Sequence, residues 1–95
     1  MITRTITVLP NGVEQFDLGS SKCKVVLMAH PRISAQYPHK LVWLSREDTW
    51  SLEHSALLPQ DGDSISFVAA GKLYFHGSNQ NTGGAARVSL IISEV

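Results

Sequence analysis

Short apolar segments separated by turn-forming residues are the feature that most restricts the fold of this chain. Runs rich in Val, Ile, Leu and Thr recur between breaks rich in Gly, Pro, Asn and Ser. No stretch repeats its apolar residues at the 3.6-residue period of an amphipathic helix. The pattern therefore predicts an all-β fold: a single antiparallel β-sandwich, jelly-roll-like, with about eight short strands.

The expected strands follow from the positions of the turn residues. They cover residues 3–9, 13–18, 23–29, 40–45, 49–54, 64–68, 73–76 and 86–94. Asn11-Gly12 favours a type I′ turn, so the first two strands are expected to form a hairpin. The turn at 69–72 is expected to join the sixth and seventh strands in the same way.

Two further expectations concern burial. The continuous apolar run at 23–29 predicts a central strand that is buried on both faces. The alternation within 49–54 predicts that Trp50 and Leu52 point into the core.

Length and charge limit the classes of function. The chain has 95 residues, the size of one domain, 1–95, and its eight Lys and Arg balance eight Asp and Glu. A neutral chain lacks the electrostatic attraction that dominates binding to nucleic acid, so no nucleic-acid partner is expected. It also has little net charge to oppose packing against copies of itself.

The sequence indicates a soluble protein made in the cytoplasm. Cys23 is the only cysteine, which leaves no internal disulfide. The first residues lack the basic region and apolar core of a signal peptide, and no apolar run approaches the roughly 20 residues of a membrane span. We therefore expect no membrane partner.

No motif in the sequence demands catalysis, a cofactor or a metal. Cys23 begins an apolar run, where a free cysteine is usually a small buried side chain. Asp61-Gly62-Asp63 lacks the other ligands of a calcium loop, and Gly83-Gly84 lacks the Lys-Ser/Thr of a phosphate loop. The histidines show no metal-ligand spacing; they are His30, His39, His54 and His76. We expect a non-enzyme without cofactor or metal.

Four aromatic residues are candidates for stacking against a ligand: Tyr37, Trp43, Trp50 and Tyr74. A glycan-binding face would expose two of them side by side. Both tryptophans lie within apolar patterns, however, and a small core needs large side chains. The core is therefore the favoured place for them.

The second half of the chain resembles a known class of proteins. It runs from Leu58-Pro59-Gln60-Asp61-Gly62-Asp63-Ser64-Ile65 to an apolar strand that follows a polar loop with Gly and Asn. These segments, about half of the chain, are similar to small β-sandwich structural proteins of bacteriophage particles, including capsid decoration proteins, minor structural proteins and tail-tip domains. The resemblance carries over no functional residue, because fold does not fix function.

The resemblance implies a non-enzymatic structural protein of a phage or virus particle, located in the virion. Its partners would be itself, as a homo-oligomer, or a major coat protein. The polar loop at 77–86 and the termini are the expected contact elements, and the named residues are Asn79, Gln80, Asn81 and Arg87.

Two other hypotheses remain open. One is a receptor- or glycan-binding module of a tail fibre or a cell surface, which requires exposed aromatic side chains. The other is an enzyme, which requires a polar constellation in a cleft.

Overall fold

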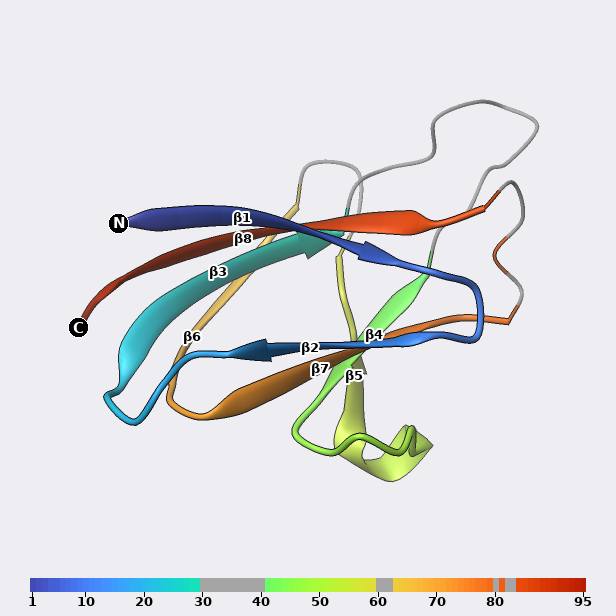
Figure 1. The fold of residues 1–95 in the computed structure, drawn as a ribbon, viewed down its shortest axis with the longest axis horizontal. Coiled ribbons are helices and arrows are strands. Elements are labelled where there is room, and N and C mark those ends of the chain that lie inside the picture. Colours follow the sequence, from blue (N-terminus) through green and yellow to red (C-terminus); the bar gives the residue numbers. More distant parts are fainter. Residues whose placement is uncertain (30–40, 60–62, 80, 82–83) are drawn as a thin grey trace.

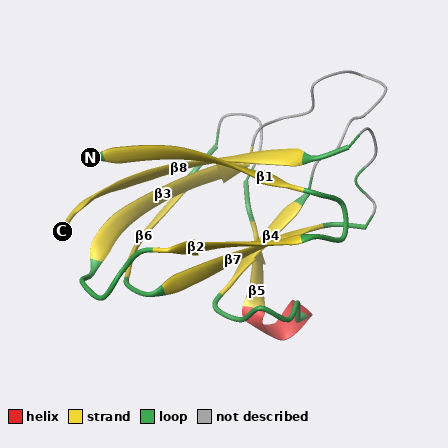
Figure 2. Ribbon diagram, viewed as in Figure 1, coloured by secondary structure: helices red, strands yellow, loops and turns green. Residues whose placement is uncertain are grey.

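The described part of the chain forms a sandwich of two four-stranded antiparallel sheets (Figure 1). The structure is a computed structural model, and it describes residues 1–29, 41–59, 63–79, 81 and 84–95. The strands are β1 (Ile2–Val8), β2 (Val13–Asp17), β3 (Cys23–Ala29), β4 (Val42–Ser45), β5 (Ser55–Leu57), β6 (Ile65–Ala69), β7 (Lys72–Gly77) and β8 (Ala86–Glu94). A 3-10 helix, η1 (Leu52–His54), precedes β5 (Figure 2).

The strand order is that of a jelly roll. Sheet A has the order β1-β8-β3-β6, and sheet B has the order β2-β7-β4-β5. Four strand pairs are nested as in one long hairpin: β1·β8, β2·β7, β3·β6 and β4·β5. When that hairpin is rolled up, β3 also pairs with β8 and β4 with β7. This is the jelly-roll arrangement. The sequence-based expectation of a jelly-roll-like sandwich is confirmed.

The core lies between the two sheets and is built from alternate residues of the strands. The fully buried apolar side chains are Val8, Val25, Leu27, Ala29, Val42, Leu58, Leu73, Phe75, Ala86, Val88 and Leu90. Strand β3 is central, between β8 and β6, as expected. Its burial on both faces is not observed: Val25 and Leu27 face the core, whereas Lys24 is exposed and Val26 half-buried on the outer face. No second layer covers that outer face within the described residues.

The first expected hairpin is wrong, because β1 and β2 belong to different sheets. The turn between them is closed by the Gly12 N–H, which donates to the carbonyl oxygen of Leu9 at 2.9 Å. Its central residues are thus Pro10 and Asn11, and only Asn11 has a positive φ, 58°. Proline at the first central position and positive φ at the second make a type II turn, which does not match the twist of a hairpin.

The expected pairing of β6 with β7 is also wrong. The connection between them carries the chain from sheet A to sheet B. Gly71, with φ of 83°, bonds there to the neighbouring connection: its N–H donates to Gly19 O, and its carbonyl accepts from Leu18 N–H. Turn residues therefore marked where the chain reverses, but these two turns join sheets instead of strands of one sheet.

The segment 49–54 differs most from expectation. Its end forms η1, and Trp50 and Leu52 are 47% and 69% exposed instead of buried. Strand β5 begins only at Ser55, after the end of the expected strand. The segment from Arg46 to Ser51 instead brings Trp50 against Trp43 on the outer face of sheet B.

Candidate functional site

A row of four side chains crosses the outer face of sheet B, and three of them, Val13, His76 and Trp43, form the floor of a pocket. Val13 of β2 is opposite His76 of β7, His76 is opposite Trp43 of β4, and Trp43 is opposite Leu57 of β5. Because Phe75 and Leu73 of β7 face the core, the alternation of the strand places His76 on the other face.

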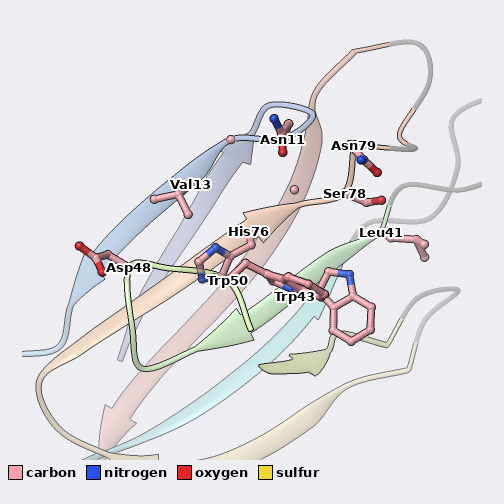
Figure 3. A pocket seen from close by; sticks show the side chains of 11 residues that line it. Asn11, Val13, Leu41, Trp43, Asp48, Trp50, His76, Ser78 and Asn79 are labelled. Carbon is pink, nitrogen blue, oxygen red and sulfur yellow. The ribbon is translucent and has the colours of Figure 1, made fainter. Parts of the chain in front are cut away.

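Trp50 forms a wall above this row (Figure 3). It reaches back from the segment after β4, and its ring lies 5.8 Å from that of Trp43 at an interplanar angle of 77°. Such an edge-to-face pair contributes about 0.5–1.5 kcal/mol beyond the area it buries. Trp43 is half-buried, and nearly half of Trp50 is exposed.

His76 fixes the segment that carries Trp50. Although it lies on the outer face, it is only 4% exposed. Its Nε2 lies 2.7 Å from Ser45 Oγ and 3.1 Å from the carbonyl oxygen of Glu47. The Ser45 hydroxyl itself donates to Glu47 O at 2.7 Å. A carbonyl only accepts, so in the tautomer with a proton on Nε2 the imidazole donates to both oxygens.

The pocket has a volume of about 520 Å³ and combines apolar walls with polar groups. Its residues are Asn11, Gly12, Val13, Leu41, Trp43, Asp48, Trp50, His76, Gly77, Ser78 and Asn79. Figure 3 shows Asn11 and Asn79 above the floor, with Asp48 at the far side. These three polar side chains are exposed. Among the described lining residues, no lysine or arginine occurs.

Close packing at Gly77 positions the turn that carries Asn11. The Asn11 N–H donates to Gly77 O at 3.1 Å, and the Gly77 N–H donates to Gly12 O at 2.9 Å. A Cβ atom on Gly77 would overlap the carbonyl oxygen of Leu9. The residue is therefore glycine because the β1–β2 turn lies directly against β7.

The side chain of Asn81 binds the residue just before β4. Its Oδ1 accepts from the Leu41 N–H at 2.7 Å, and its Nδ2 donates to the Leu41 carbonyl at 3.0 Å. The side chain is 7% exposed. The Leu41 carbonyl also accepts from the Ser78 N–H at 3.1 Å, and both ends of the Asn81 amide are hydrogen-bonded within the chain.

The other expected contact residues have different placements. Asn79 lies on the pocket rim, and Arg87 is exposed on β8, opposite Thr7 of β1. Gln80 lies outside the described residues.

The structure places the four aromatic candidates for stacking in different surroundings. Trp43 and Trp50 come together in the pocket. Tyr74 lies half-buried two residues before His76 on the same face of β7, but it does not line the pocket. Tyr37 lies outside the described residues. Asn11, Asp48 and His76 were not predicted as pocket residues from the sequence. The Pro10-Asn11 pair, which is typical of a type II turn, was the one sequence signal that could have pointed to Asn11.

A second concavity lies between the edge strands β5 and β6. We call it the β5–β6 groove; it has a volume of about 590 Å³. Its residues are Leu44, Ser45, Arg46, His54, Ser55, Ala56, Ile65, Phe67, Val68, Ala69, Ala70 and Leu73. Ile65 and Phe67 pack on the core yet stay partly exposed here. The two sheets therefore do not close over the core along this side.

The remaining candidates for chemistry are scattered. Cys23 is half-buried, with its Sγ 3.5 Å from Ala69 O, and His54 is exposed beside Glu53. Across the described ranges, His, Cys, Asp and Glu form no group of three that could hold a metal ion. The same ranges contain no helix with the length and apolar character of a membrane span.

Comparisons of the chain with protein-family models, with curated proteins and with solved structures gave no match. The functional conclusions below therefore depend on the geometry of this molecule and on the sequence resemblance described above.

Proposed function

We propose that this chain is a non-enzymatic structural protein of a phage or virus particle, a capsid decoration or minor structural protein that acts through contacts with copies of itself or with a major coat protein. The observation that carries the proposal is the β5–β6 groove, where core side chains stay partly exposed at the edge of the sandwich.

Strand β6 has the properties of an assembly edge. It is the last strand of sheet A, and its sequence, Ile-Ser-Phe-Val-Ala, contains no charge and no proline. Natural edge strands usually carry a charged residue or a proline, because an unpaired apolar edge can pair with another chain. Val68 on this strand is 54% exposed. A neighbouring subunit that covers β6 would bury Val68, Ile65 and Phe67 together.

The charge of the whole chain supports the same proposal. With a formal net charge of zero, copies of the chain do not repel one another at long range. The jelly roll is an architecture of viral capsid proteins, although it also occurs in lectins and other proteins.

Hydrogen exchange at low and high protein concentration tests the assembly edge. We expect the amides of β6 to gain protection as the concentration rises, while those of β1, the other edge of sheet A, do not. Val68→Glu places a carboxylate opposite Lys24, a pairing that the isolated sheet tolerates, and it should abolish the added protection.

The matched control is Thr5→Glu, which adds the same charge on exposed β1. It should leave the concentration effect unchanged. Equal protection of β6 at all concentrations would contradict the proposed edge.

Membership of a particle has its own test. Particles released by cells that carry the gene for this chain would be purified and analysed by quantitative mass spectrometry. The proposal predicts the chain at a fixed ratio to the major coat protein; its absence from washed particles would overturn the proposal.

A further inference from the structure

We propose that the pocket on the outer face of sheet B binds a neutral sugar, with the sugar ring packed in the angle between the indoles of Trp43 and Trp50. This inference goes beyond the proposed structural role and does not depend on it. It would give a particle protein a means of contacting a glycosylated surface.

The aromatic walls supply the apolar half of such a site. A pyranose has faces of C–H groups that pack on aromatic rings, and its hydroxyls lie at the ring edge. Trp50 is 47% exposed, and its ring is held edge-to-face with Trp43. A large apolar side chain that is held in place yet open to solvent does not serve the core.

The polar rim supplies the other half. Asn11, Asp48 and Asn79 come from three separate segments and lie around the same hollow (Figure 3). Side-chain amides both donate and accept hydrogen bonds, and a carboxylate accepts two or more. Sugar hydroxyls need donors and acceptors together. A few placed polar groups over an apolar floor are typical of small-molecule sites.

Charge and size narrow the class of ligand. Asp48 is the only carboxylate among the described lining residues, and no lysine or arginine accompanies it. An anionic sugar or a phosphate would meet repulsion without a compensating cation. A quaternary ammonium group would suit the indoles and Asp48, but it would leave the amides of Asn11 and Asn79 unused. The volume, about 520 Å³, is within the ~300–1,000 Å³ range of ligand sites.

The site is preorganised. The His76 Nε2 lies within hydrogen-bond distance of Ser45 Oγ and Glu47 O, which fixes the segment that leads to Asp48 and Trp50. Gly77 fixes the turn that carries Asn11. Less side-chain and loop freedom is then lost when a ligand binds.

The test is an NMR titration of the full chain with four neutral probes: glucose, galactose, mannose and N-acetylglucosamine, each also as its 1,4-linked disaccharide. We expect saturable shifts of the Trp43 and Trp50 indole N–H signals and of the Asn11 and Asn79 side-chain amides with at least one probe. Saturation-transfer spectra should show contact through the sugar C–H protons.

Trp50→Ala is the decisive variant, because its side chain lies on the surface and its loss leaves the core intact. It should lower the affinity at least tenfold. Leu52→Ala is the matched control, since Leu52 is 69% exposed two residues away and does not line the pocket; it should bind as the wild type does.

Three outcomes would overturn the proposal. They are no saturable shift with any of the probes, equal affinity of Trp50→Ala and the wild type, or indole shifts with tetramethylammonium alone. The last result would assign the pocket to a cation instead of a sugar.

Discussion

At the scale of single residues, two positions without charge or catalytic chemistry determine the shape of the pocket end of the molecule. Asn81 binds both backbone groups of Leu41, and Gly77 lets the β1–β2 turn approach β7. Neither could be recognised from the sequence alone. Asn81 is one of several polar residues in a Gly- and Asn-rich loop, and nothing local distinguishes the buried one.

Asn81→Ala should destabilise the protein by about 1–3 kcal/mol, because the Leu41 N–H loses its acceptor in a partly buried position. Thermal unfolding would measure this as a fall in Tm of roughly 4–8 °C per kcal/mol. Asn79→Ala, at the exposed rim, should change the Tm little. Equal Tm values for the two variants would contradict the role assigned to Asn81.

Gly77→Ala should cost about 1–3 kcal/mol or more, since the added methyl group would overlap the Leu9 carbonyl and the turn must move. In NMR spectra the amide signals of Asn11 and Gly12 should shift. Gly19→Ala is the comparison: Gly19 has a positive φ of 89° but open space around it. We expect Gly19→Ala to lower the stability without shifting the Asn11 amide signal. That result would distinguish backbone strain at a single residue from displacement of the β1–β2 turn.

At the scale of elements, the sequence predicted where most strands lie but not which strands pair. Except for β5, the apolar runs predicted every strand to within two residues at each end, because the pattern of apolar residues is a local property. The partner of a strand depends on residues far along the chain, so both expected hairpins were wrong. The expected burial of Trp50 failed for a related reason: its packing partner is Trp43 on the outer face of sheet B.

The segment between β4 and η1 should loosen when its hydrogen bonds are removed. In a Trp43→Phe background Trp50 is the only tryptophan, so tryptophan fluorescence reports on it alone. There, His76→Leu removes the donor to Ser45 Oγ and Glu47 O, and iodide should quench Trp50 more strongly than in the parent. Ser66→Ala, on exposed β6, serves as the control. Unchanged quenching in His76→Leu would show that other contacts hold the segment.

At the scale of the whole molecule, the nested strand pairs close the sandwich over a continuous core but leave the β5–β6 side open. The sequence predicted the jelly-roll-like sandwich and placed the two tryptophans among the ligand candidates. It could not predict the groove or the pocket, because both arise where segments distant in sequence meet. These two concavities lie on different sides of sheet B, so assembly and ligand binding would not compete for the same surface.

The central claim is that this jelly roll associates with copies of itself through its open side. Light scattering on a sizing column, over a concentration series, measures this most directly. The account predicts a mass that is a multiple of the 10.4 kDa chain for the wild type and for Thr5→Glu, and a single-chain mass for Val68→Glu. A wild-type mass of one chain at every concentration would contradict the claim.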